Sequence, residues 1–201
     1  MNKPPLSLII GKRQWRTPPL SQSSSRGFTL IELLVILVIV AVLAMVGVPS
    51  MAGIMDSIKL SSASNVFLSS LHLARSEAIK RNGRVVLCKS ADGVSCESSG
   101  GWEQGWFVFH DANNDGAFNS DEAVIERAQP LPGNLRLTGN SNVARYVSFV
   151  STGATKLVSG AFQAGTLTLC RQSVSGGDAR QIILNSAGRP RIQKVAVDTC
   201  I

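Results

Sequence analysis

The stretch GRPR, residues 188–191, contains two arginines with the type and spacing of a phosphate-binding pair. In extended backbone, residues two apart lie about 6.6 Å from each other and point to the same side. Guanidinium groups bind phosphate bidentately, so Arg189 and Arg191 suit a nucleic-acid backbone, and the preceding glycine would allow close approach. The other candidates for a phosphate-binding surface that could meet DNA are Gly188, Lys194, Arg171 and Arg180. The alternative is that these residues only solvate a surface or protect an edge strand.

The uneven distribution of charge indicates where a polyanion would bind. The formal net charge is +7, and residues 1–27 contribute five basic residues and no acid. Residues 97–126 contain seven acids and no Lys or Arg, whereas residues 127–201 contain nine bases and two acids. Aromatic residues are scarce in this basic region, so the sequence favours DNA binding through the backbone, with little sequence preference.

A second candidate site is acidic. Asp111, Asn113, Asp115, Gly116 and Glu122 have the spacing of an EF-hand calcium loop. That loop needs a helix on each side, whereas the flanking segments GWFVFH and AVIERA have the composition of strands. Asn and Asp are also ordinary turn residues. The sequence therefore predicts a turn-rich connection between two strands, and no metal ion or other cofactor is expected.

Catalytic motifs are absent from the sequence. It contains no Gly-x-Ser-x-Gly and no phosphate-binding glycine loop. Neither is there a Cys/His pair that would stay free once the cysteines are oxidised. We therefore expect a protein that is not an enzyme.

The elements that position these residues follow from two kinds of hydrophobic pattern. After residue 83, short β-branched or aromatic runs alternate with Gly, Asn and Ser clusters, which is typical of strands. The runs are residues 84–88, 105–110, 123–128, 134–139, 146–151, 165–170, 180–185 and 191–197. Before them, an amphipathic pattern over residues 49–82 predicts a helix whose apolar stripe packs on the sheet. Its members include Met51, Ile54, Met55, Ile58, Val66, Phe67, Leu71, Ala74 and Ala78. The expected fold is α+β, with one long N-terminal helix packed on a mainly antiparallel sheet.

The first half of the helix has the length of a membrane span. The apolar run from Phe28 to Val48 has 21 residues, which as a helix cover about 31 Å. The basic residues ahead of it predict a cytoplasmic N-terminus, a single pass through the inner membrane and a periplasmic C-terminal domain. A plain signal anchor is the alternative, and it leaves Glu32 unexplained.

The four cysteines of this exported domain predict disulfides. Cys88, Cys96, Cys170 and Cys200 allow three pairings, and spacing alone does not choose among them. We favour Cys88 with Cys96 and Cys170 with Cys200, since these are nearest in sequence. A zinc site is disfavoured because the chain has no Cys-x-x-Cys and only two histidines.

The residues around the start of the apolar run carry a family resemblance. RGFTLIEL, residues 26–33, resembles the leader junction of type IV pilins and type II secretion pseudopilins. The resemblance implies that a prepilin peptidase cuts between Gly27 and Phe28, removes the leader 1–27 and methylates the amine of Phe28. Glu32 then becomes the fifth residue of the mature chain. A carboxylate in the bilayer needs a cationic partner, which after cleavage would be an N-terminal amine, either its own or that of a neighbouring subunit. Glu32 is thus expected to act in assembly with other pilin subunits.

The rest of the chain resembles the FimT/GspH branch of minor pilins and pseudopilins. That resemblance implies a periplasmic helix segment at residues 49–82 and a β-rich globular domain at 83–201, after the transmembrane segment 28–48. GRPR resembles the Gly-Arg-x-Arg motif by which FimT-type minor pilins bind DNA during natural transformation. The sequence thus favours a minor type IV pilin of FimT type, incorporated in a pilus and binding DNA. The alternative is the H-type minor pseudopilin of a type II secretion system, a structural component of a periplasmic fibre.

Overall fold

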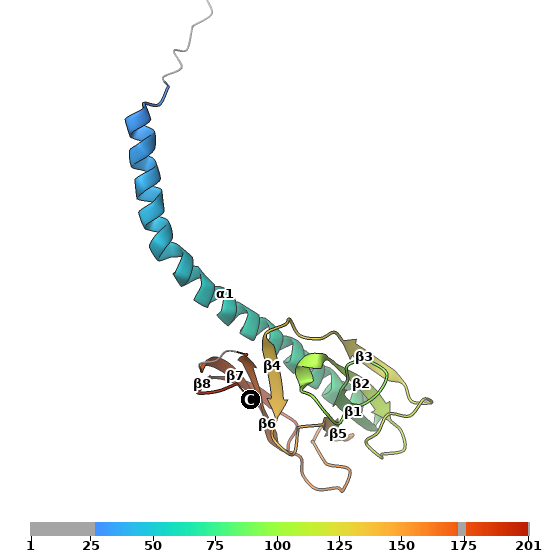
Figure 1. Ribbon diagram of the computed structural model, residues 1–201. Helices are drawn as coiled ribbons and strands as arrows, with labels where there is room; N and C mark the ends of the chain where they lie inside the picture. Colours follow the sequence, from blue (N-terminus) through green and yellow to red (C-terminus); the bar gives the residue numbers. More distant parts are fainter. Residues whose placement is uncertain (1–26, 173–175, 201) are drawn as a thin grey trace, which may run out of the picture. The chain divides into compact units, whose positions relative to one another are not determined.

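The computed structural model describes residues 27–172 and 176–200, without the side chains of residues 46, 48–50 and 52 (Figure 1). The predicted leader, apart from Gly27, lies outside the described residues. The chain divides into two compact units, one ending at Val46 and one beginning at Gly47. Helix α1 (Leu30–Arg81) contains 52 residues and contributes to both units.

Local signals set both ends of α1. At its start, Thr29 and Glu32 form a capping box. The Glu32 amide donates to Thr29 Oγ1 over 3.3 Å, and the Thr29 amide donates to Glu32 Oε2 over 3.5 Å. At its end, Asn82 adopts a positive φ of 49° and the Gly83 amide donates to the Ala78 carbonyl. Among the described residues, no helical stretch combines the length and the apolarity required to cross a membrane.

In the described part of the second unit, eight strands form two antiparallel sheets. The first sheet has the order β3-β2-β1-β5 and the second the order β4-β6-β7-β8. The first contains β1 (Arg84–Lys89), β2 (Trp106–Asp111), β3 (Val124–Ala128) and β5 (Tyr146–Phe149). The second contains β4 (Leu135–Gly139), β6 (Gly165–Arg171), β7 (Gly177–Leu184) and β8 (Pro190–Val197). The α+β fold is confirmed, with the difference that the strands form two sheets.

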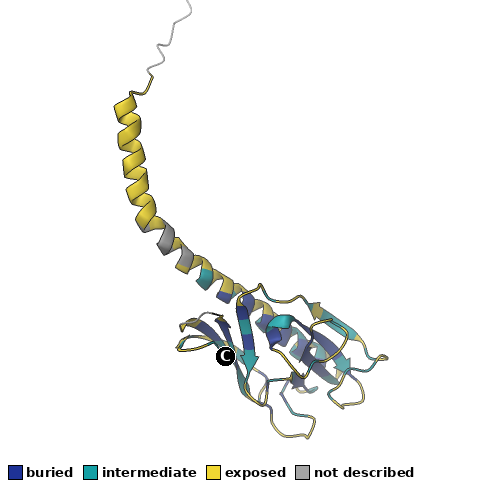
Figure 2. Ribbon diagram, in the orientation of Figure 1, coloured by how far each residue is buried: buried dark blue, intermediate teal, exposed yellow. Residues whose placement is uncertain are grey.

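The core lies where α1 packs on the sheets (Figure 2). Phe67 is fully buried and meets the rings of Trp102 and Trp106 edge-on, at centroid distances of 5.2 and 4.9 Å. Trp106 Nε1 also donates to Ser70 Oγ, 3.0 Å away, which satisfies two buried polar groups. Apolar burial and edge-to-face ring packing therefore attach the helix to the first sheet.

The apolar stripe of the helix is covered only in part. Leu71, Ala74 and Ala78 are buried as expected. Other members of the predicted stripe stay exposed, namely Met51, Ile54, Met55, Ile58 and Val66. The prediction that the whole stripe packs on a sheet is therefore wrong for these residues. The first four precede Leu60, where the helix begins to bury side chains, and Val66 lies beyond it on an uncovered side of the helix.

Two disulfides link residues of the second unit. Cys88 is bonded to Cys96, and Cys170 to Cys200, which is the pairing that proximity in sequence favours. The second bridge attaches the end of the chain to β6, and each closes a loop that would otherwise add entropy to the unfolded state.

Candidate functional site

The predicted phosphate-binding arginines lie at the hairpin between β7 and β8. The two strands pair in register from Leu184 opposite Pro190 to Gly177 opposite Val197. In the turn, the Gly188 amide donates to the Asn185 carbonyl over 2.9 Å. The Arg189 amide donates to Asn185 Oδ1, also over 2.9 Å. Asn and Gly are the residues that tight turns favour, and Gly188 has a φ of 72°.

This turn is fixed against the segment that follows β5. The Thr155 amide donates to the Ser186 carbonyl over 3.1 Å, and Thr155 Oγ1 donates to the Asn185 carbonyl over 3.0 Å. Gly188 is buried, and a Cβ atom added there would collide with the carbonyl oxygen of Gly153. The prediction that Gly188 opens the backbone to a ligand is therefore wrong: its missing side chain accommodates the chain's own backbone. The result is a rigidly held turn.

Three cations of the hairpin are free to meet a ligand. Arg189, Arg191 and Lys194 are exposed, and their side chains form no hydrogen bond or ion pair with any residue that the structure describes. Because β8 begins at Pro190, the extended geometry assumed from sequence holds for Arg191, whereas Arg189 belongs to the turn. Arg191 lies opposite Ile183 and Lys194 opposite Arg180, so these two cations are on different faces of β8.

Arg180 does not belong to this surface. It is 2% exposed, and its Nη2 donates to Ser57 Oγ at 3.1 Å and to Ser61 Oγ at 3.4 Å, both on α1. Its Nη1 donates to the Ala179 carbonyl over 3.1 Å. The prediction of a DNA contact at Arg180 is corrected, because the guanidinium is occupied between helix and sheet. Arg180 shares its face with Ile182 and Leu184, and strand alternation could have identified it as inward-facing.

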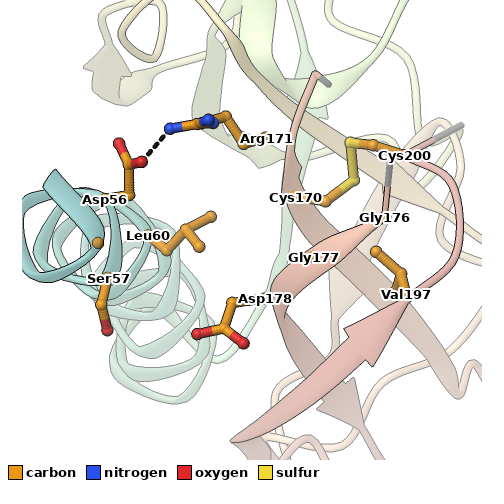
Figure 3. A pocket seen from close by; sticks show the side chains of 11 residues that line it. Asp56, Ser57, Leu60, Cys170, Arg171, Gly176, Gly177, Asp178, Val197 and Cys200 are labelled. Atoms are coloured by element: carbon orange, nitrogen blue, oxygen red, sulfur yellow. Dashed lines mark hydrogen bonds and ion pairs between the residues drawn. A yellow bond between two sulfur atoms is a disulfide. The ribbon is translucent and has the colours of Figure 1, made fainter. Parts of the chain in front are cut away.

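Arg171 is likewise engaged with the helix. Its guanidinium forms an ion pair with the Asp56 carboxylate across a pocket of about 280 Å³ (Figure 3). The pocket lies between α1 and the ends of β6 and β7, beside the disulfide from Cys170 to Cys200. With 43% of its side chain exposed, Arg171 keeps solvent contact, but its charge is already balanced. We therefore remove it from the candidate DNA surface too.

The acidic loop between β2 and β3 is held by its own backbone. Asp111 is 1% exposed and accepts the Asp115 and Gly116 amides at 3.1 and 2.9 Å. Glu122 accepts the Ala112 amide at 2.8 Å and, through its other oxygen, the Asn119 amide. Strands flank the loop, as predicted. Within the part of the chain that the structure describes, no three His, Cys, Asp or Glu residues are grouped to hold a metal ion.

The pKa values of the loop carboxyls follow from these contacts. Burial raises the pKa of Asp111, although the amides it accepts act in the opposite direction. The amide of Ala117, donating over 2.7 Å, lowers the pKa of Asp115. These carboxylates serve as turn acceptors, which accounts for their spacing without a cation.

The predicted processing and assembly residues lie in the first unit. Gly27 is exposed, and a Cβ atom there would meet no other atom within 4 Å; Phe28 is 76% exposed. Glu32 has a structural role that the sequence reasoning missed, since it completes the capping box with Thr29. The Thr-x-x-Glu spacing is the signal that could have found it. Cleavage at Gly27, methylation at Phe28 and assembly through Glu32 stay predictions.

Comparison with known proteins places the chain among pilin-like proteins. The family model of the type II transport protein GspH matches residues 63–188, and that of the prokaryotic N-terminal methylation motif matches residues 22–48. No curated protein sequence matches significantly. The Pseudomonas aeruginosa PAO1 type IV minor pilin FimU has a similar structure in its P21 crystal form. The identity is 18% and the TM-score 0.53, over 74% of this chain and 99% of that one. The P65 form of FimU has a TM-score of 0.49 at 18% identity, over 71% and 100% of the chains.

Proposed function

Because the chain belongs to the GspH family of pilins and pseudopilins, we propose that it is a minor type IV pilin that binds DNA through its β7–β8 hairpin. Cleavage after Gly27 would free the amine of Phe28, and residues 28–48 would anchor the subunit in the inner membrane. Glu32 would then neutralise the amine of a neighbouring subunit during assembly. The domain from residue 83 would lie in the periplasm and then on the pilus, where it meets DNA for uptake in natural transformation.

The observation that carries the proposal is the presence of three unpaired cations on one hairpin, Arg189 in its fixed turn and Arg191 and Lys194 on β8. A guanidinium that already has a carboxylate partner, as in Arg171, gains little from a phosphate. Arg189, Arg191 and Lys194 have no such partner among the described residues. The bonds from Thr155 and the packing of Gly188 hold the turn, so little conformational entropy is lost when DNA binds.

The H-type pseudopilin of a type II secretion system is the second candidate. The description of the matching family supports it, and the helix, the methylation motif and the two sheets would serve either fibre. Such a pseudopilin moves proteins and needs no phosphate-binding surface. The two functions therefore differ in whether the hairpin cations are used.

Salt-dependent binding to duplex DNA tests the proposal. The soluble unit from residue 47 onward would be titrated into labelled duplexes of unrelated sequence, with fluorescence anisotropy as the readout. Each phosphate contact contributes about −0.9 to the slope of log affinity against log salt, so three cations give a slope of about −2.7. Binding of this kind is weak for a single domain, about micromolar or poorer.

Paired substitutions then locate the contact. Arg189→Gln with Arg191→Gln should reduce the slope to about −0.9, because one cation is left. Arg127→Gln with Arg145→Gln removes the same charge from two exposed arginines outside the second sheet that have no ion pair with a described residue, and this is the matched control. Equal losses from both pairs would mean that net charge alone attracts DNA. Absence of binding at low salt would refute the DNA proposal and favour the secretion pseudopilin.

A further inference from the structure

Each sheet ends in an open edge strand. β3 is at the edge of the first sheet and β8 at the edge of the second. The two strands lie at opposite ends of the second unit in Figure 1. In the β7–β8 hairpin, the bond from the Asn185 amide to the Arg189 carbonyl marks these two residues as a hydrogen-bonded pair of the antiparallel ladder. Every second residue of β8 after Arg189 therefore directs its backbone groups toward β7, and the residues between them face away. Alternation along β8 then directs the backbone N–H and C=O groups of Ile192, Lys194 and Ala196 toward the open edge. An edge of this kind can pair with another chain.

The β8 side is basic, and the face of β3 toward α1 carries a carboxylate. The β8 side has the three unpaired cations Arg189, Arg191 and Lys194. The β3 side has Asp121, which is exposed and forms no ion pair with a described residue, and Glu126 on the strand itself; the exposed Arg127 lies on the other face of β3. Complementary charges on opposite ends of one domain favour contact between copies related by translation rather than by a twofold axis.

A groove beside β3 contains a carboxylate without a partner. The groove has a volume of about 520 Å³ and lies between α1 and the residues from β3 to Pro132. Ile58, Val66 and Leu131 supply apolar walls. Glu126 also lines it, and Glu126 Oε2 is buried without a hydrogen-bond partner among the described residues. Lys59 lines the same groove but forms no ion pair with Glu126.

The unpaired oxygen defines what would fit. Leaving a buried carboxylate oxygen without a donor costs free energy, so an occupant with a cation at this point would be favoured. The same occupant should have apolar side chains for the walls of the groove. β8 has both features, since Lys194 shares its face of the strand with the half-buried Ile192, two residues before it.

We propose that β8 of one copy docks on the β3 side of a second copy, with the Lys194 ammonium donating to the Glu126 carboxylate. The contact is heterologous, because β8 of one copy meets a different surface, the groove, on the next. Repeating it builds a row of copies with a free β8 at one end and a free groove at the other. This inference concerns the neighbouring subunit and does not rest on DNA binding.

Zero-length crosslinking tests the contact in the full-length chain. Equal amounts of ¹⁵N-labelled and unlabelled protein would be mixed in detergent micelles and treated with a carbodiimide, which joins amines to carboxylates in contact. We expect a mixed-isotope peptide that joins Lys194 to Glu126 or to Asp121. If Lys194 were crosslinked only within one copy, its crosslinked peptides would carry a single isotope, and the proposal would be overturned. The same holds if the mixed-isotope peptides join Glu126 to another lysine and never to Lys194.

A charge swap makes the test specific. Glu126→Lys alone and Lys194→Glu alone each remove one of the two coupling groups, so neither variant by itself should give the crosslink between positions 194 and 126. Mixing the two variants should restore a crosslink between the exchanged side chains. Lys80→Glu, at an exposed lysine of α1, is the control and should leave the yield unchanged. Glu126→Gln should weaken the contact without changing DNA affinity, which separates this proposal from the previous one. Failure of the mixture to recover would refute the pairing.

Discussion

Replacing Gly188 with alanine would measure how strongly the β7–β8 turn is held. The residue has a φ of 72°, and a side chain in the left-handed region costs about 1–2 kcal/mol. The new methyl group would also collide with the Gly153 carbonyl oxygen, and overpacking of this kind costs about 1–3 kcal/mol. The sum is about 2–5 kcal/mol, a large part of the stability of an ordinary domain.

Two other glycines separate the terms of this sum. Gly160 has a φ of 87° with no atom near a Cβ position, so Gly160→Ala should cost only the conformational part, about 1–2 kcal/mol. Gly177 has open space and no positive φ, and Gly177→Ala should be neutral or stabilise by up to about 1 kcal/mol. The predicted order of the cost is therefore Gly188, then Gly160, then Gly177.

Urea unfolding of the unit from residue 47 onward provides the measurement. Disulfides stay oxidised, and fluorescence of the buried Trp102 and Trp106 reports the transition. Equal costs at Gly188 and Gly160 would show that the contact with Gly153 is not tight. If Gly188→Ala cost no more than Gly177→Ala, the left-handed turn itself would be refuted.

Four further perturbations address separate contacts. Arg180→Ala should cost about 2–4 kcal/mol, since its hydrogen bonds to α1 and its buried stem are lost. Arg171→Ala should cost at most about 1 kcal/mol by the same denaturation assay, because its ion pair with Asp56 is partly exposed. A loss of DNA binding in a folded Arg180→Ala variant would contradict the assignment of Arg180 to the contact with α1. Glu32→Gln retains a capping side chain but loses the charge, so recovery in sheared filaments should fall while membrane insertion stays normal. Normal recovery would refute the assembly role. The backbone amide of Val94, helped by the amide and hydroxyl of Ser95 and the hydroxyl of Ser90, lowers the pKa of Asp92. The ionised Asp92 side chain therefore helps to hold the 90–97 loop at pH values above the ordinary Asp pKa of about 4. That contribution is lost as the pH falls toward the lowered pKa of the folded state. Hydrogen exchange of the loop should therefore rise in acid, and Asp92→Asn should remove that dependence; an unchanged pH profile would count against it.

The strand positions could be predicted from sequence because each depends on local pattern. Runs such as RVVLC and GWFVFH alternate or cluster apolar residues between turn residues, and each of the eight runs overlaps a strand. The division into two sheets depends on which strands meet in space. β5 pairs with β1 although about 60 residues separate them, and no local pattern in either strand specifies that pairing.

The candidate site was predictable in its exposed part only. Arg191 and Lys194 are exposed where composition placed a basic surface. Arg171 and Arg180 carry the same charge, but their partners Asp56 and Ser57 are more than 100 residues earlier on α1. Composition counts charges without showing which are already neutralised or buried. Alternation with Ile182 gave a local signal for Arg180, whereas the Arg171 pair could be found only from the packed helix.

The two proposed uses of β8 would exclude each other, and this has a consequence for where DNA would bind. In a row of copies, each occupied groove covers Lys194 of its neighbour, so only the copy at one end presents Arg191 and Lys194 together. DNA binding would then be confined to that end without any separate targeting signal. The prediction is that added duplex DNA lowers the yield of the Lys194–Glu126 crosslink between copies, and that Arg189→Gln relieves the effect, because Arg189 contributes to the phosphate contact but not to the groove. An unchanged yield under saturating DNA would show that the two ligands use different parts of the strand.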